Sequence, residues 1–311
     1  MRDRGGRAVK DVPPQVRERT IAKARTLIEA LPFMREHRGK VLVVKYGGAA
    51  MERAPLARPF AQDVALLLSV GIHVVVVHGG GPQVTEVSER LGLEARFVEG
   101  HRVTDRATLD VATMVLAGKL NTEVVGRLVA SGVPAVGLSG VDGGLLLARR
   151  RHPDLGFVGE IAEVRGDVVR SLLDRGFVPV VASIAAGDDG QPFNVNADVV
   201  GAELAVALGA EKLVFVVDVP GLLGPGGDLH SELAATECRQ LLASGAVTGG
   251  MVPKVESALR AIAGGVGRVH LIDGRVEHAL VLELFTPEGV GTMITADGAP
   301  APVPVPAEAA P

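Results

Sequence analysis

Two glycine-rich segments that follow short apolar runs are the residues best suited to do chemistry. Lys45-Tyr46-Gly47-Gly48 ends the first run, and His78-Gly79-Gly80-Gly81-Pro82 ends the next one. Glycines let the backbone turn its N–H groups toward a ligand, and a helix that starts after Pro82 adds the positive end of its dipole. Glycines also close ordinary tight turns. Two such segments in succession, one with a lysine at the strand end, nevertheless favour an anionic ligand.

Three further segments carry polar groups next to expected strand ends or helix starts. Asn194-Val195-Asn196-Ala197-Asp198 precedes a helix; helix capping explains Asn196 but not Asn194. Asp218-Val219-Pro220-Gly221-Leu222 follows a strand, where a nucleotide could lie across the backbone. Thr248-Gly249-Gly250-Met251-Val252-Pro253-Lys254 opens a helix and brings a second lysine to a glycine loop. The pattern predicts an anion-binding crevice at the strand ends.

Several common site types are absent from the sequence. No G-x-x-x-x-G-K-[ST] string occurs and no G-x-G-x-x-G follows a strand, which disfavours a P-loop kinase and a dinucleotide-binding oxidoreductase. The single cysteine, Cys238, cannot form an intramolecular disulfide, and no Cys/His group has the spacing of a zinc site. We therefore expect no metal ligands from the protein and a reducing compartment.

Charge and composition disfavour other partners. The 311 residues include 32 Lys and Arg against 36 Asp and Glu, a net charge of −4, and only 3% aromatic residues. There is no basic stripe for nucleic acid and no apolar segment flanked by cations for a membrane. The first ten residues lack the apolar stretch of a secretory signal, so we expect a cytoplasmic protein.

From Lys40 onward, β-branched runs alternate with longer helical stretches, which is typical of a parallel sheet covered by helices. We expect strands at residues 41–45, 72–78, 134–138, 178–184, 212–217, 268–272 and 292–294, an antiparallel excursion at 145–149 and 157–164, and a hairpin turn at 187–190. We expect helices at 56–70, 83–91, 107–131, 168–175, 197–208, 236–243, 253–263 and 277–285. The predicted fold class is α/β, an open and mostly parallel central sheet with helices on both faces, in two lobes.

The expected domain organisation has four parts. Residues 1–38 form a helical extension, in which Asp11 caps a helix that Pro32 ends. Residues 39–209 form the first lobe and residues 210–297 the second. Residues 298–311 form a disordered Ala/Pro-rich tail, because this stretch has no periodic apolar face.

From about Gly39 to Asp297 the chain resembles the amino acid kinase family, and within it the branch that acts on N-acetyl-L-glutamate. The resemblance rests on the five segments above and on Gly100-His101-Arg102-Val103-Thr104, in the family's order. It implies an αβα sandwich in which the first lobe binds acetylglutamate and forms dimers, and the second binds ATP. The implied reaction transfers the γ-phosphoryl group of ATP to the side-chain carboxylate, giving N-acetyl-L-glutamyl 5-phosphate for arginine biosynthesis. Such a carboxylate, with a pKa of about 4.3, is already ionised at neutral pH and needs no general base.

The resemblance also implies roles for individual residues. Lys45 and Lys254 would stabilise the transition state, and Asp198 would hold both lysines in place. The substrate would lie against Gly80, Gly81, Arg102 and Asn194. ATP would lie against Gly47, Gly48, Asp218, Gly221, Leu222 and Thr248. Mg²⁺ would be bound mainly through the ATP phosphates.

The segments 13–31 and 270–292 are similar to those of the arginine-inhibited members of this branch. In those members the N-terminal helix joins dimers into a hexamer, a trimer of dimers, and arginine binds near the junction of that helix with the nucleotide lobe. By this resemblance Lys212, His270, Glu283 and Gly289 would bind the inhibitor. An ordinary amphipathic helix packed on its own subunit is the alternative for residues 13–31.

Two alternatives to this function remain open at the level of sequence. One is another amino acid kinase, acting on glutamate, aspartate, carbamate or UMP. The other is a non-catalytic arginine-binding scaffold of the same fold. Arg102 and Asn194 favour a substrate with an α-carboxylate beside a blocked amine, while both lysines and Asp198 favour an enzyme.

Overall fold

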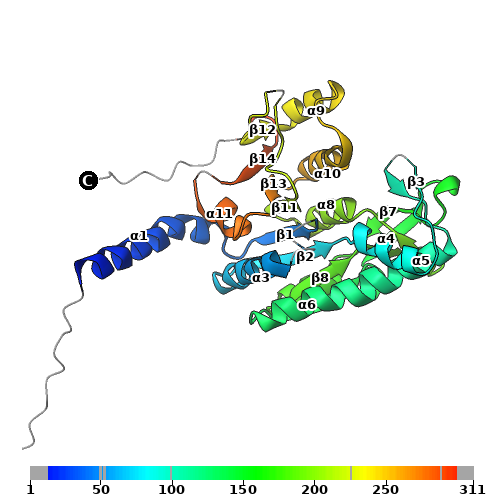
Figure 1. Ribbon diagram of the computed structural model, residues 1–311, viewed down its shortest axis with the longest axis horizontal. Coiled ribbons are helices and arrows are strands. Elements are labelled where there is room, and N and C mark those ends of the chain that lie inside the picture. Colours follow the sequence, from blue (N-terminus) through cyan, green and yellow to red (C-terminus); the bar gives the residue numbers. More distant parts are fainter. Residues whose placement is uncertain are drawn as a thin grey trace, which may run out of the picture.

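The computed structural model describes residues 13–48, 51, 54–98, 100–224, 226–287 and 289–299. Its centre is an eight-stranded sheet with the strand order β12-β14-β13-β11-β1-β2-β8-β5 (Figure 1). Every pair in it is parallel except β13 with β14. The strands are β1 (Val41–Tyr46), β2 (His73–His78), β5 (Ala135–Ser139), β8 (Val178–Ala182), β11 (Lys212–Val217), β12 (Glu232–Ala234), β13 (Arg268–Asp273) and β14 (Gly291–Thr295). The predicted α/β class with a mostly parallel sheet is confirmed.

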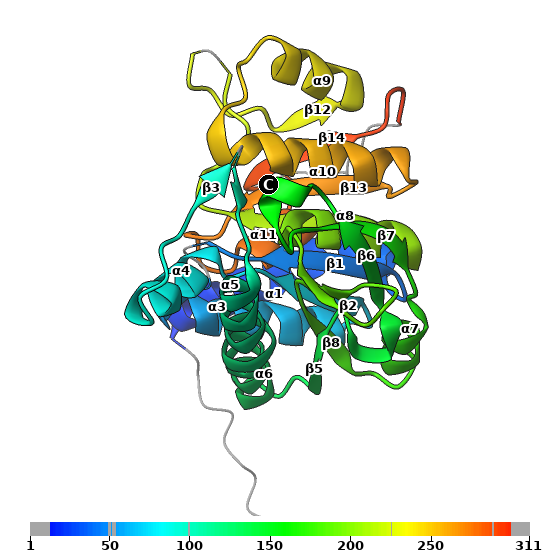
Figure 2. The same cartoon turned by 90° about the vertical axis from the view of Figure 1, so that its right-hand side faces the viewer.

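Helices cover both faces of this sheet. The α-helices are α1 (Pro14–His37), α3 (Ala54–Ser69), α4 (Gly81–Arg90), α5 (Arg106–Thr113), α6 (Asn121–Ala130), α7 (Asp167–Leu173), α8 (Ala197–Leu208), α9 (Ala235–Ala243), α10 (Val252–Ala263) and α11 (Ala279–Phe285). Shorter turns of helix are η2 (Asp142–Gly144), η3 (Pro153–Leu155) and η4 (Gly249–Met251), and η1 (Met114–Leu120) is a π-helix. Helices α7 to α10 pack on one face, and α3 to α6 with α11 pack on the other (Figures 1 and 2).

Two hydrophobic cores result from the alternation of side chains along each strand. In β1, Val43 lies in the core under α8 and α10, whereas Leu42 and Val44 lie in the core under α3 and α6. Lys45 is two residues after Val43 and therefore points to the α8 face. Tyr46 points to the other face and stacks on Phe60 of α3, with 3.8 Å between the ring centroids.

The sheet order groups the strands by their place in the chain. β1, β2, β5 and β8 come from residues 39–209 and lie together, and the four strands of residues 210–297 continue the sheet beyond β1. Gly209 caps α8 with a φ of +62°, after which the chain enters β11 next to β1. In the described sheet the strands of the two halves pair through β1 and β11, and the boundary between two lobes near this point stays a prediction.

Smaller sheets extend from the first half. A four-stranded sheet, in the order β10-β9-β6-β7, contains β6 (Leu146–Arg150), β7 (Gly159–Val164), β9 (Ile184–Ala186) and β10 (Pro192–Asn194). The predicted strand at 178–184 is therefore two strands, because the chain leaves the main sheet at Ser183. The expected turn at 187–190 joins β9 to β10 as an antiparallel hairpin.

Other predicted elements differ from the structure. Pro32 does not end α1, which continues to His37 although proline lacks a backbone N–H. Phe33 and Met34 pack against the core and His37 is buried, so tertiary contacts hold the last turn helical. The predicted helix over 107–131 is interrupted by η1, and neither β12 nor the hairpin of β3 (Phe97–Val98) and β4 (His101–Arg102) was predicted.

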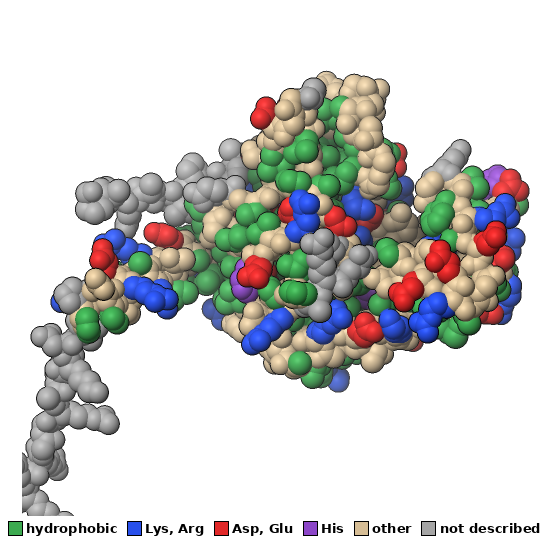
Figure 3. Space-filling view, in the orientation of Figure 1, with side chains coloured by type: hydrophobic (Ala, Val, Ile, Leu, Met, Phe, Trp, Pro, Cys, Tyr) green, Lys and Arg blue, Asp and Glu red, His purple; other side chains and the backbone are tan. Residues whose placement is uncertain are grey.

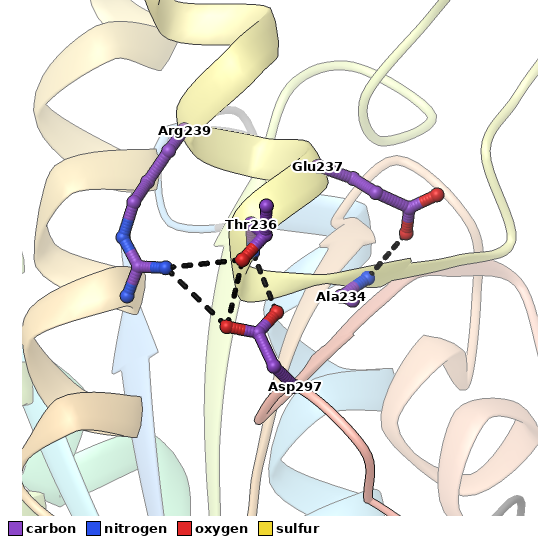
Figure 4. Close-up of polar contacts among 5 residues, drawn as sticks. All are labelled: Ala234, Thr236, Glu237, Arg239 and Asp297. Carbon is purple, nitrogen blue, oxygen red and sulfur yellow. Dashed lines mark hydrogen bonds and ion pairs between the residues drawn. The ribbon is translucent and has the colours of Figure 1, made fainter.

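The end of the described chain is fastened to the second half. Asp297 accepts hydrogen bonds from the backbone N–H and the hydroxyl of Thr236 at the start of α9, both at 2.8 Å, and lies 3.4 Å from Arg239 (Figure 4). Nearby, Glu237 accepts from the N–H of Ala234 at 2.7 Å. Most of the predicted tail at 298–311 and the predicted Asp11 cap lie outside the described residues.

The outer surface carries charges of both signs. On the face shown in Figure 3, Lys and Arg side chains alternate with Asp and Glu rather than forming one basic stripe. Among the described residues, no helix is both long enough and apolar enough to cross a membrane.

Candidate active site

Three charged residues from distant segments meet where β1 ends. Asp198, in the first turn of α8, lies between two lysines, with its Oδ1 3.0 Å from Lys45 Nζ and its Oδ2 2.9 Å from Lys254 Nζ. Lys254 comes from the first turn of α10, which runs beside α8 (Figure 2). The structure thus brings together the three residues to which the sequence assigns catalysis.

The electrostatics of this cluster favour an anion. Asp198 is buried, and burial by itself would raise the pKa of its carboxyl. The attraction of Lys45 and Lys254 outweighs burial, so the pKa of Asp198 is held below its usual value. Two ammonium groups share one carboxylate, which leaves an excess positive charge in a place of low exposure. A phosphoryl group would neutralise that charge.

The loop after β1 is shaped around two charged side chains. A Cβ on Gly47 would lie 2.8 Å from Lys45 Nζ, so only glycine leaves the ammonium group its place. Gly48 has a φ of +62°, and a Cβ there would collide with the carboxylate of Asp218 at the end of β11. Adjacent parallel strands therefore bring Gly48 and Asp218 into direct contact.

The loop after β2 packs closely against the π-helix η1. Gly80 is the N-cap of α4, and a Cβ on it would collide with Leu120 and Leu116 of η1. Gly81 accepts a hydrogen bond through its carbonyl from Arg102 Nη2 at 2.9 Å. The absence of a side chain at Gly80 thus allows the start of α4 to lie against the π-helix.

Arg102 is held in place at one of its terminal nitrogens. Nη2 also donates to the hydroxyl of Thr85 at 2.5 Å, and the guanidinium lies 4.8 Å from the ring centroid of Phe97. Among the described residues, its Nη1 is buried and has no hydrogen-bond partner. Burial lowers the pKa of Arg102. A positioned cation with an unused donor suits a carboxylate ligand.

Asn194 is connected to the same segment. Its Nδ2 donates to the hydroxyl of Thr104 at 3.3 Å, and that hydroxyl donates to the carbonyl of Arg102 at 2.9 Å. The sequence alone assigns no role to Thr85, Phe97 or Thr104. Only Thr104 lies in one of the segments that carry the family resemblance, and the contacts of the other two depend on how β3, β4 and α4 pack.

The residues assigned to ATP lie along the second half. Leu222 is buried, and its N–H donates to the hydroxyl of Thr292 on β14 at 2.8 Å. Gly221 is required there because a Cβ would meet the same Thr292 hydroxyl. Thr248 is exposed at the N-cap of η4, which leads into α10 and Lys254.

The four residues assigned to arginine also meet in space. His270 Nδ1 lies 2.6 Å from Glu283 Oε1, and Lys212 Nζ lies 3.4 Å from His270 Nε2. Glu283 Oε2 accepts from the N–H of Val290 at 2.7 Å, and a Cβ on Gly289 would crowd the same oxygen. Glu283 is buried rather than an exposed helix residue. Burial lowers the pKa of Lys212 to about 8.

Metal ligands from the protein are not grouped in the part of the chain that the structure describes. There, no set of three or more His, Cys, Asp or Glu residues could hold a metal ion. Asp198, the buried carboxylate of the site, is already committed to two ammonium groups.

Comparison with known proteins identifies the family of the chain. The model of the amino acid kinase family matches residues 40–273. The chain is 50% identical over 289 residues to acetylglutamate kinase of Symbiobacterium thermophilum, covering 89% of this chain and 99% of that protein. It is 51% identical over 294 residues to acetylglutamate kinase of Frankia casuarinae, covering 91% of this chain and 81% of that protein.

Solved structures agree with the fold. N-acetylglutamate synthase from Neisseria gonorrhoeae, complexed with coenzyme A and N-acetyl-glutamate, superposes with a TM-score of 0.80 at 29% identity. The match covers 89% of this chain but 64% of the synthase, so the synthase has a further part that this chain does not match. Carbamate kinase from Giardia, with a TM-score of 0.65 at 16% identity, shares the fold. The strand-end loops, the Lys45–Asp198–Lys254 cluster and these matches together establish that the chain belongs to the amino acid kinase family.

Proposed function

We propose that this protein is an acetylglutamate kinase, which transfers the γ-phosphoryl group of ATP to the side-chain carboxylate of N-acetyl-L-glutamate in arginine biosynthesis. The observation that carries the proposal is the Lys45–Asp198–Lys254 cluster at the strand ends. Relatives that share about half of its residues over nearly their whole length bear the name of this enzyme.

The chemistry needs charge stabilisation more than proton transfer. The acceptor carboxylate is ionised at neutral pH, so the protein has to align two anions that repel each other. Lys45 reaches the reacting groups from the acceptor side and Lys254 from the nucleotide side. The backbone N–H groups of Gly48 and Gly80 add donors for the transferring group, and Asp198 fixes both lysines before the substrates arrive.

Mg²⁺ would enter with ATP. Because Asp198 is paired with lysines, we assign the ion to the ATP phosphates and not to a protein cluster. Bound there, it would neutralise phosphate charge. The residues Gly47, Gly48, Asp218, Gly221, Leu222 and Thr248 would hold the nucleotide.

The residues that would select the substrate lie at the end of the acceptor that carries the α-carboxylate and the acetylated amine. Arg102 would bind the α-carboxylate through its unused Nη1, next to Gly80 and Gly81. Asn194 would lie beside the blocked amine, held by Thr104. A free amino group would bring a positive charge close to Arg102, which disfavours glutamate and aspartate.

One assay tests the activity. The protein is supplied with ATP, Mg²⁺ and either N-acetyl-L-glutamate, glutamate, aspartate, carbamate or UMP, and acyl phosphate is trapped with hydroxylamine while ADP is measured. We expect the hydroxamate with N-acetyl-L-glutamate. ADP release with another acceptor alone would identify a different amino acid kinase. Unchanged turnover in Lys254→Ala would overturn the mechanism, and no turnover with arginine binding intact would indicate a scaffold.

We also propose that L-arginine inhibits the enzyme by binding next to Lys212, His270, Glu283 and Gly289. The support is the meeting of these residues beside the end of α1, where Arg268 lies 3.4 Å from Glu36. Inhibition requires that arginine bind an inactive arrangement more tightly than the active one. Arginine should lower turnover of the unmodified protein and leave Glu283→Gln much less inhibited. Equal inhibition of both proteins would reject the site. The cytoplasmic location stays a prediction of the sequence.

A further inference from the structure

A buried histidine lies directly behind the glycine loop of β2. His78 is the last residue of β2 and is fully buried, on the face of the sheet opposite to Lys45. Its Nδ1 lies 2.9 Å from the carbonyl oxygen of Gly79, and its Nε2 lies 3.1 Å from Nδ2 of Asn121. The mechanism above does not use this side chain.

The neighbours of His78 fix which ring nitrogen carries the proton. Burial lowers the pKa of His78, the Gly79 hydrogen bond partly opposes this, and Lys45 lowers the pKa further, so the ring is neutral. A carbonyl only accepts, so Nδ1 must donate to Gly79 and Nε2 must accept from Asn121. The amide of Asn121 is itself oriented, because Nδ2 also donates to the carbonyl of Val180 at 2.8 Å.

Asn121 belongs to the segment that touches the loop from the same side. It follows the π-helix η1, whose Leu116 and Leu120 lie against Gly80. Gly137 on β5 gives the Asn121 amide its room, since a Cβ there would collide with Oδ1. Carbonyls of β8 and β5 thereby orient Asn121, Asn121 orients His78, and His78 holds the carbonyl of Gly79.

The peptide between Gly79 and Gly80 transmits this constraint. Peptide bonds are planar and trans here, so the carbonyl of Gly79 and the N–H of Gly80 point in opposite directions. Holding the carbonyl toward His78 turns the N–H of Gly80 toward the face on which Lys45 lies. We infer that His78 is a positioning residue, which with Asn121 orients the Gly80 N–H as a phosphoryl-binding donor. This inference rests on the proposed kinase activity.

Two isosteric amides separate the positioning role from simple filling of space. In His78→Asn the side-chain nitrogen can occupy the place of Nδ1 and still donate to Gly79. In His78→Gln it occupies the place of Nε2, and the donor to Gly79 is lost. His78→Leu removes both groups, and His73→Leu, at the start of β2, is the control for loss of an imidazole from the same strand.

We expect kcat of His78→Gln and His78→Leu to fall at least about tenfold, because a misdirected donor forfeits part of the 10²–10³ that such donors contribute. KM for ATP should change far less, and His78→Asn should keep kcat within about threefold of the unmodified enzyme. Wild-type kcat in His78→Gln, or equal losses in the Asn and Gln variants, would overturn the inference.

Crystal structures of the same variants provide a readout that needs no turnover. The Gly79 carbonyl should keep its direction in His78→Asn and rotate in His78→Gln. An unrotated peptide in His78→Gln would refute the positioning role even if the protein proved not to phosphorylate N-acetyl-L-glutamate. Conversely, the unmodified protein could lack kinase activity while the Gly79 carbonyl still rotates in His78→Gln. That result would support the positioning role of His78 and reject the proposed function.

Discussion

At the scale of residues, the main feature of the candidate site is the placement of three charged side chains. Lys45 and Lys254 come from segments more than two hundred residues apart, and one buried carboxylate holds both ammonium groups within 3.0 Å. The same carboxylate at the start of α8 has an ordinary explanation as part of a helix N-terminus, where acidic residues are favourable. Its contacts show that it acts across the molecule, as a shared counter-ion.

Asp198→Asn is expected to remove that counter-ion and leave two partly buried cations together. Loss of one partner from a buried ion pair costs about 3–5 kcal/mol of unfolding free energy, and kcat should fall at least about 100-fold. Chemical denaturation and steady-state kinetics measure the two effects. Asp110→Asn, which alters an exposed pair with Arg106 at 3.7 Å, is the control and should cost less than about 1 kcal/mol. A similar small cost for both variants would contradict this account.

Gly47→Ala tests the position of one ammonium group. The added Cβ would lie 2.8 Å from Lys45 Nζ, and the flexible lysine end can move away without disturbing the fold. A displacement of about 1 Å can cost about 10²-fold in rate, so kcat should fall by tenfold or more at an unchanged melting temperature. Gly126→Ala on α6, where the new Cβ meets nothing within 4 Å, should leave kcat unchanged. Full activity of Gly47→Ala would show that Lys45 does not need this position.

At the scale of helices and strands, the packing of the end of α1 against the rest of the protein has a consequence for stability. The last turn of α1 persists past Pro32 because it packs on α11 and the core, and it brings His37 next to Lys212 and Arg268. Burial, with the neighbouring cations, lowers the pKa of His37 to about 4. Protonation of His37 at the end of α1 is therefore expected to lower the stability of the fold.

The sign of that effect follows from the two pKa values. Between pH 6.5 and about 4 the unfolded chain binds a proton at His37 that the folded chain does not, so stability falls as the pH falls through this window. The loss amounts to at most about 3 kcal/mol. Urea denaturation between pH 4 and 7 should show a weaker acid-induced loss in His37→Phe than in the unmodified protein.

The pH profile of His37→Phe has to be compared with that of the unmodified protein, because protonation of Asp63 changes the stability in the opposite direction. Burial raises the pKa of Asp63 to about 6, although His278 at 2.6 Å opposes the rise. The folded chain therefore binds the additional proton there between pH 3.8 and about 6, which stabilises it on acidification. Identical pH profiles for the unmodified protein and His37→Phe would refute the assignment to His37.

At the scale of the whole molecule, α1 projects from the body (Figure 1). Several of its apolar side chains are exposed. These are Val16, Ile21, Leu27, Ile28 and Leu31, with 40 to 67% of their surface exposed. Packing of these side chains against another copy of the chain would remove their apolar surface from water. The role of this helix in a hexamer stays a prediction of the sequence resemblance.

Removal of residues 1–31 is expected to abolish hexamers and leave dimers, as measured by sedimentation velocity. The last turn of α1, with Phe33 and Met34 in the core, remains in the shortened chain, so it should still fold. A milder variant, Leu27→Glu with Ile28→Glu, should have the same effect because both side chains are about two-thirds exposed. Hexamers in both variants would refute this role.

The sequence by itself determined the class of the fold and the identity of the chemical groups. β-Branched runs and helical periods are local properties, so the extents of α8 and β11 were predicted to the residue. The glycine loops after β1 and β2 predicted an anion site. Glycines at a strand end allow backbone N–H groups to point toward a ligand, and this too can be read from the local sequence.

Only the tertiary structure decided which groups face one another. Asp198 pairs with Lys45 and Lys254, Arg102 with Thr85, and Asn121 with His78, and in each case the partners belong to different elements. Tertiary packing also overrode local signals, keeping α1 helical past Pro32 and converting part of a long helix into η1. Local sequence specifies which residues can bind an anion, while distances, burial and pKa values arise from long-range contacts that no local pattern encodes.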